Sequence, residues 1–171
     1  MRRVAVIGTA SGNGKTTLGR ALAERLGVPF VELDALHHGP GWTEATAEQL
    51  RARVEPFLEL DAWVIDGGYQ GKLGDLVLEA ADTVVWLDLP IRTWLPRLMR
   101  RTARRIVRKE ELWSGNRESL LGALGGRDAL IPFALRHHRR RRREYPARLA
   151  RFNVVRLQST KEVERWLETS S

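Results

Sequence analysis

Short apolar runs recur along the chain, and most of them stop at Gly or Asp. They occupy residues 4–7, 30–33, 63–65, 83–87 and 152–157. Runs of this length, rich in Val and Ile, are typical of buried strands. We therefore expect five strands, the second of them ending at Asp34.

Amphipathic helices are predicted between these strands. Residues 16–26 carry leucines at helical spacing, and residues 46–60 carry a second apolar stripe. Ser159 and Glu162 have the spacing of a capping box and start a last helix. Its inner face is expected to hold Val163, Trp166 and Leu167. Strands alternating with helices in this way favour an α/β fold, with a parallel sheet covered by helices on both faces.

The segment 91–150 differs from the rest of the chain in its charge. It begins as an Arg-rich predicted helix, is expected to be loop at residues 114–116 and again from Gly122 to Gly126, and then continues as a second basic helix. The chain has a formal charge of +8, and residues 92–151 hold 18 of its 29 Lys and Arg but 5 of its 21 Asp and Glu. Such a segment can bind nucleic acid, a membrane surface or an anionic small molecule, and charge alone leaves all three open. We expect it to form a lid within a single domain of residues 1–171.

The composition gives no sign of secretion or of membrane insertion. There is no cysteine, and the apolar run near the N-terminus is too short for a signal peptide. The longest apolar stretches fall far short of a bilayer span. A cytoplasmic protein without membrane contact is therefore expected.

The strongest candidate for chemistry lies between the first predicted strand and the first predicted helix. It resembles the phosphate-binding loop G-x-x-x-x-G-K-[ST]. The residues expected to bind nucleotide are Gly12, Asn13, Gly14, Lys15, Thr16 and Thr17. In such a loop the glycines let backbone N–H groups face the phosphates, Lys15 reaches the β- and γ-phosphates, and the Thr16 hydroxyl binds magnesium. We therefore expect ATP and Mg²⁺ as ligands.

One position departs from that pattern. The first glycine should lie five residues before Gly14, where this chain has Thr9, and Gly8 lies one residue earlier. Either the turn starts early or it tolerates threonine. The alternative is a Gly-rich turn with an incidental lysine, which the flanking strand and helix disfavour.

Three aspartates follow predicted strands: Asp34, Asp66 and Asp88. Ligands of open α/β sheets sit beyond the carboxyl ends of the strands, so these carboxylates are expected to converge near the phosphates. We expect Asp66 to serve the metal, because the two glycines after it leave room for a ligand. Asp34 is the candidate general base or acceptor anchor. The alternative for each is a turn-forming or helix-capping aspartate, and Asp88 fits that alternative best.

Arginines in the lid segment are candidates for stabilising the transferred phosphoryl group. Arg97 and Arg101 are four residues apart on a predicted helix, so one face can present both, although a solvated basic face is the alternative. Residues 139–143 are all arginine and must point around their helix, which favours a solubilising or acid-pairing surface and leaves RNA contact open. The histidine pairs at 37–38 and 137–138 lack the spacing of a metal site, and no chemistry is assigned to them.

Several segments together resemble the adenylate-kinase-like P-loop proteins called topology modulation proteins, within the nucleoside monophosphate kinase superfamily. They are residues 6–18, 31–38, 40–42, 63–69, 83–90, 154–157 and 162–167. The resemblance implies a P-loop NTPase three-layer sandwich with strand order 2-3-1-4-5 and an Arg-rich lid. It also implies that Asp66 holds magnesium through water and that Arg97 and Arg101 contact the nucleotide. Nucleotide kinases continue Asp-Gly as Phe-Pro-Arg, whereas this chain has Gly68-Tyr69-Gln70, which counts against a nucleoside monophosphate acceptor.

These observations favour a kinase that transfers the γ-phosphoryl group of MgATP to a nucleotide-like or hydroxylated small acceptor. Lys15, Asp34, Arg97 and Arg101 are its expected catalytic residues. A regulatory P-loop ATPase is the main alternative, and an RNA-binding P-loop protein using the arginine tract is a third. The chain has no Asn-Lys-x-Asp segment for reading guanine, which argues against a GTPase.

Overall fold

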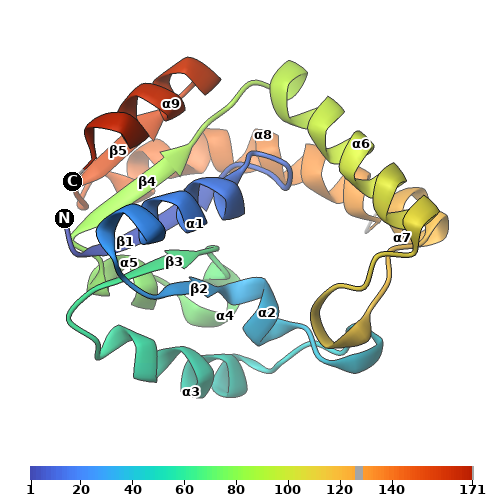
Figure 1. The fold of residues 1–171 in the computed structure, drawn as a ribbon, viewed down its shortest axis with the longest axis horizontal. Helices are drawn as coiled ribbons and strands as arrows, with labels where there is room; N and C mark the ends of the chain where they lie inside the picture. The colour runs from blue at the N-terminus through green and yellow to red at the C-terminus, as the bar shows by residue number, and fades with distance from the viewer. Residues whose placement is uncertain (126–128, 171) are drawn as a thin grey trace.

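A five-stranded parallel sheet forms the centre of the molecule (Figure 1). The computed structural model describes residues 1–125 and 129–170. The strands are β1 (Arg3–Gly8), β2 (Phe30–Glu32), β3 (Trp63–Asp66), β4 (Thr83–Leu87) and β5 (Val154–Leu157). Their order is β2-β3-β1-β4-β5, with every pairing parallel. This order confirms the expectation from the resemblance.

Helices occupy most of the remaining described chain. They are α1 (Lys15–Leu26), α2 (Leu33–His37), α3 (Ala47–Leu58), α4 (Gln70–Leu73), α5 (Leu76–Ala80), α6 (Ile91–Arg108), α7 (Leu120–Leu124), α8 (Leu130–Leu149) and α9 (Thr160–Thr169). Two short 3₁₀ turns, η1 (Pro40–Trp42) and η2 (Trp113–Gly115), lie in the loops. Ser159 caps α9 by accepting a hydrogen bond from the Glu162 backbone N–H, as its spacing predicts.

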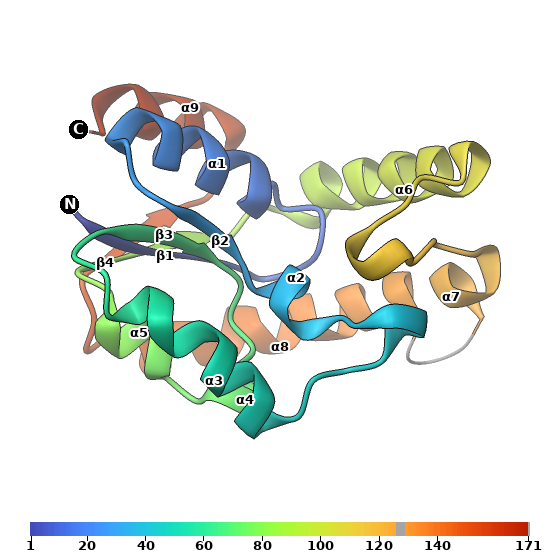
Figure 2. The ribbon, with the colours of Figure 1, turned by 60° about the horizontal axis from the view of Figure 1, so that its bottom comes forward.

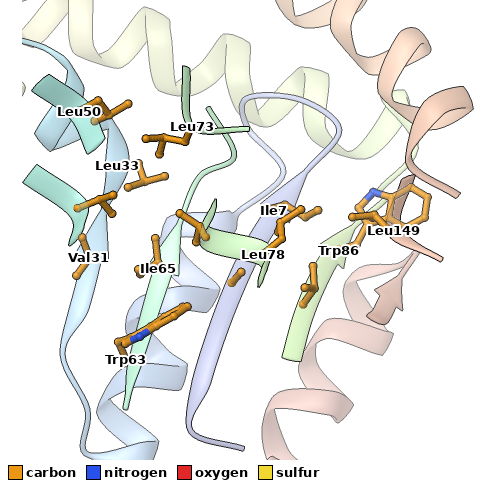
Figure 3. Packing of buried hydrophobic residues seen from close by; sticks show 14 of the residues in the cluster. Ile7, Val31, Leu33, Leu50, Trp63, Ile65, Leu73, Leu78, Trp86 and Leu149 are labelled. Atoms are coloured by element: carbon orange, nitrogen blue, oxygen red, sulfur yellow. The ribbon is translucent and has the colours of Figure 1, made fainter. Parts of the chain in front are cut away.

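The sheet is the middle layer of three (Figure 2). Alternate residues of β1 point to opposite faces, so Val4 and Val6 pack toward α1 and α9, while Ala5 and Ile7 pack toward α3, α5 and the end of α8. Figure 3 shows the second of these cores, in which Ile7, Ile65 and Trp86 meet side chains from the covering helices. The predicted sandwich is therefore confirmed.

Helices α6 and α8 extend beyond the sheet, with α7 near their far ends (Figures 1 and 2). They are joined near the sheet by a small apolar cluster in which Trp94 and Leu98 of α6 meet Ala134 of α8 and Ala10 of the loop after β1. The Arg-rich segment thus stands over the carboxyl ends of the strands. Gly126, one limit of the predicted loose section, lies outside the described residues.

Strands β2 and β5 are shorter than predicted, whereas β1 is one residue longer at each end and β3 includes Asp66. Strand β2 ends at Glu32, and Asp34 lies in the first turn of α2 instead of directly after the strand. The edge strand β2 pairs with β3 alone, and the last paired residues are Glu32 and Asp66, after which Gly67 turns the partner strand away. Strand β5 begins at Val154, two residues later than predicted.

Candidate active site

The loop from β1 to α1 has the backbone geometry of a phosphate-binding loop. Gly14 takes the left-handed conformation and precedes the first residue of α1. Gly12 has φ of +84°, and a Cβ there would lie 2.9 Å from the Trp94 carbonyl oxygen and from the Leu98 Cβ. Within the described chain, the N–H groups of residues 10–14 donate to no backbone carbonyl. A row of free N–H groups at a helix N-terminus is suited to bind an anion.

The predicted loop residues divide into two groups. Lys15 lines the cavity described below, whereas the buried Asn13 side chain turns inward and donates to Thr9 Oγ1 and to the Leu87 carbonyl, both at 3.0 Å. The amide side chain of Asn13 therefore holds the loop, and its backbone N–H is the group that remains for a phosphate. Thr17 is exposed on the first turn of α1.

Thr16 and Asp66 lie together, as the magnesium prediction requires. The Thr16 hydroxyl donates to Asp66 Oδ2 at 2.6 Å and also lies 3.3 Å from Glu32 Oε1. Burial raises the pKa of Asp66, against the opposing effects of Lys15 and the Thr16 hydrogen bond. Its second oxygen, Oδ1, is buried without a hydrogen-bond partner. Glu32, at the end of β2, is a member of this group that the sequence analysis missed.

The oxygen donors of this group fit magnesium. Mg²⁺ prefers oxygen ligands and is usually held by one or two protein groups together with substrate phosphates and water. No cluster of three His, Cys, Asp or Glu side chains that could cage a metal occurs in the described ranges. A metal here would therefore need the phosphates to complete its shell, which is the arrangement of a nucleotide site.

A cavity of about 870 Å³ connects this loop to the acidic side chain of α2. Lys15 and Ser11 line it from the phosphate-binding loop, and Asp34 lines it from α2. Asp34 Oδ1 accepts a hydrogen bond of 2.6 Å from the Tyr69 hydroxyl. Burial and the negative charge of Asp34 raise the pKa of Tyr69, so its hydroxyl stays protonated and donates. One oxygen of Asp34 is held in this way, and the other accepts no hydrogen bond from the described residues.

The two predicted lid arginines are placed differently. Arg101 lines the cavity, and burial together with the neighbouring Arg105 lowers its pKa. Arg97 is exposed and donates to Thr160 Oγ1 at the start of α9, at 3.0 Å. Arg97 is not among the cavity-lining residues, so contact with a phosphate would require its side chain to leave Thr160.

The arginines at 139–143 point in several directions, as expected for consecutive helical residues. Arg141 enters the cavity, where its Nη1 lies 3.4 Å from the Gly8 carbonyl oxygen. Arg142 lies 3.4 Å from Asp88, which is fully buried and also paired with Arg156 at 2.5 Å. Asp88 thus joins β4 to β5 and α8 as a structural residue. Arg141 was missed because nothing local separates it from its four arginine neighbours.

Three aromatic side chains, those of His38, Trp42 and Trp113, form one wall of the cavity. His38 stacks on Trp113 with ring centroids 5.8 Å apart and meets Trp42 edge-on. These rings sit in two hairpin-like loops, residues 38–44 and 111–117, each closed by an isolated antiparallel bridge. Asn116 joins the loops, because its amide accepts from the Trp42 N–H at 2.9 Å and donates to the Gly39 carbonyl at 2.8 Å. One wall of the cavity is therefore formed jointly by residues 38–44 and 111–117.

Comparison with known proteins agrees with this geometry. A family model described as shikimate kinase matches residues 11–54, which include residues 12–17 of the predicted nucleotide-binding set and Asp34. A shikimate kinase of Chlorobium chlorochromatii is 33% identical over 119 residues. That alignment spans 59% of this chain and 60% of the relative.

Solved structures resemble the chain over nearly its whole length. A shikimate kinase from Bacteroides thetaiotaomicron has a TM-score of 0.58 at 19% identity, covering 98% of this chain and 94% of its own. A deoxyadenosine kinase from M. mycoides with bound dATP has a TM-score of 0.52 at 16% identity, covering 96% and 97%. The fold is that of the P-loop kinases. No helix in the described part of this P-loop protein is long and apolar enough to cross a membrane.

Proposed function

We propose that this chain is an ATP-dependent phosphotransferase that moves the γ-phosphoryl group of MgATP to a hydroxyl group of a small acceptor. The observation that carries the proposal is the shared cavity, in which Lys15 of the phosphate-binding loop and the Tyr69-bound Asp34 face one space. A nucleotide-binding switch needs Lys15 but has no use for a carboxylate facing the same space. Phosphoryl transfer to a hydroxyl group requires such a carboxylate, and Asp34 is in the position to provide it.

On the donor side, the loop holds the triphosphate. The N–H groups of residues 10–14 and the start of α1 bind the phosphates, and Lys15 adds charge beside the β- and γ-phosphates. Thr16, Asp66 and Glu32 would hold the magnesium ion, directly or through water. When bound, the ion supplies positive charge to the β- and γ-oxygens.

On the acceptor side, Asp34 serves as general base. Tyr69 fixes one carboxylate oxygen, so the other can accept the proton of the attacking hydroxyl. Arg101 and Arg141 line the cavity from α6 and α8 and would stabilise charge on the transferred group with planar guanidinium forks. The proposed catalytic set is therefore Lys15, Asp34, Arg101 and Arg141, and a role for Arg97 stays a prediction.

The acceptor is proposed to be a small polyol or hydroxy acid, with shikimate as the first compound to test. Three features support this order: the family model over residues 11–54, the 33% identity to a shikimate kinase, and Gly68-Tyr69-Gln70 in place of Phe-Pro-Arg. Deoxynucleosides come second, because aromatic rings line the cavity and a deoxyadenosine kinase shares the fold. The narrower likeness to topology modulation proteins stays a prediction.

The direct test measures ATP consumption and phosphorylated product with shikimate, gluconate, deoxyadenosine and AMP, each at saturating MgATP. We expect product from at least one hydroxylated acceptor and none from any acceptor with Lys15→Ala. ATP hydrolysis that no acceptor accelerates would favour the regulatory ATPase instead. A gel shift with RNA that weakens steeply with salt, without turnover on any acceptor, would favour the RNA-binding alternative.

A further inference from the structure

Thr9 occupies the place of the first glycine of the phosphate-binding loop, and the structure makes use of its side chain. The residue is fully buried, and its backbone N–H donates to the Leu87 carbonyl at 3.2 Å, which extends the β1 to β4 pairing by one residue. A glycine here would have no side-chain hydroxyl that needs a hydrogen-bond partner. A buried threonine must satisfy its hydroxyl within the protein.

The Thr9 hydroxyl joins two other buried polar side chains. Asn13 donates to Thr9 Oγ1 at 3.0 Å, and His138 Nδ1 lies 3.0 Å from the same oxygen. Since Asn13 gives its other hydrogen to the Leu87 carbonyl, Thr9 accepts from Asn13 and can donate its single hydrogen to His138. That assignment requires a neutral His138 with its proton on Nε2.

The surroundings of His138 favour the neutral ring. Burial and the nearby Arg142 hold the pKa of His138 below its usual range, with Arg139 acting in the same direction and Asp88 opposing it. Trp94 of α6 packs against the ring with centroids 5.3 Å apart. The His138 ring, which α8 carries, is therefore fixed between α6 and the start of the phosphate-binding loop.

This arrangement ties the loop to the helix that carries Arg141. His138 and Arg141 lie one helical turn apart on α8, and Arg141 enters the cavity beside Gly8, the residue before Thr9. A shift of the loop relative to α8 would therefore change the distance between its N–H groups and the Arg141 guanidinium.

We propose that Thr9, Asn13 and His138 are positioning residues, which hold the phosphate-binding loop in its triphosphate-binding conformation and in register with Arg141. The inference rests on the proposed function in that the loop must bind MgATP. Threonine in the glycine position is then a structural link between loop and lid helix. None of the three side chains needs to touch the nucleotide.

The test compares Thr9→Val, which keeps the shape but removes the hydroxyl, with Thr9→Ser, which keeps the hydroxyl. The affinity for a fluorescent N-methylanthraniloyl ATP with Mg²⁺ is measured for each variant, together with its melting temperature. Thr83→Val is the matched control, because Thr83 is also a buried threonine whose hydroxyl donates to a side chain, Asp82 Oδ1, but it lies at the opposite end of β4.

We expect Thr9→Val to weaken nucleotide binding roughly 10- to 100-fold, because it leaves Asn13 and His138 without their shared partner. Thr9→Ser and Thr83→Val should stay within about twofold of the unchanged protein. His138→Phe removes the network from the α8 side and should weaken binding like Thr9→Val, and it serves as the test if Thr9→Val does not fold. The double variant should bind little worse than either single variant, because both break one unit.

Nucleotide affinity unchanged in Thr9→Val and in His138→Phe would overturn the proposal. So would an equal loss in Thr83→Val, since the effect would then be one of general stability. These outcomes differ from a failure of the proposed function, in which the unchanged protein itself would not bind the nucleotide.

Discussion

The two carboxylates Asp34 and Asp66 should fail in different ways when each is replaced by asparagine. In Asp34→Asn the side-chain carbonyl can still accept the Tyr69 hydrogen bond, so the position of the side chain is kept. The second carboxylate oxygen becomes an NH₂ group, which cannot take a proton. The change therefore removes the proposed base while leaving the phosphate-binding loop untouched.

The size of the Asp34 effect follows from its proposed role as general base. Loss of a positioned general base costs about 10²–10⁴ in rate, which corresponds to about 2.7–5.4 kcal/mol in the barrier to transfer. Binding of MgATP and slow hydrolysis by water should stay near normal. Tyr69→Phe should give a smaller loss, because the carboxylate would remain but would no longer be oriented.

Asp66→Asn should instead depress all turnover. Its carboxylate accepts from Thr16 and has a buried, unpartnered second oxygen, so an amide there would present N–H groups to a cation. Metal affinity should fall about 10- to 100-fold, and added magnesium should partly restore both hydrolysis and transfer. Burial raises the pKa of Asp66, so MgATP binding should weaken as the pH falls through that raised pKa, at a higher pH than an ordinary carboxyl would give. Asp66→Asn should lose this step.

The assay measures ADP release with and without acceptor, over a magnesium titration, for both variants and the unchanged protein. If Asp34→Asn abolishes nucleotide binding while Asp66→Asn spares it, the two roles are exchanged. If both variants transfer at the normal rate, neither carboxylate acts in the reaction and the kinase proposal fails.

Further variants test the loop, the lid and the wall of the cavity. Lys15→Ala should abolish transfer without lowering the melting temperature, since its side chain lines the cavity and not the core. Arg101→Lys should lower kcat for transfer more than Arg97→Lys, because Arg101 lines the cavity whereas Arg97 donates to Thr160. Equal effects would contradict the placement of these side chains. Asn116→Ala should lower the free energy of unfolding by about 1–3 kcal/mol in a urea titration, because it leaves the Trp42 N–H and the Gly39 carbonyl unpaired. An unchanged midpoint would mean that water replaces both bonds.

The local pattern of the sequence determined the fold class and the position of the phosphate-binding loop. Short continuous apolar runs predicted the strands, because a strand buried on both faces is apolar at every position. Leucines at helical spacing predicted α1, because a helix buried on one face repeats its apolar residues about every 3.6 positions. The phosphate-binding loop was equally readable, since its chemistry comes from backbone N–H groups and one lysine within a few residues.

Tertiary structure decided what depends on residues far apart in the chain. The Thr16 hydroxyl meets Asp66 across 50 positions, and Thr9 meets His138 across 129. Arg141 lies in the cavity while Arg142 faces Asp88, although both belong to one uniform arginine run. A run of identical residues carries no periodicity of its own, so only the packing of α8 against the loop and the sheet selects which guanidinium enters the site.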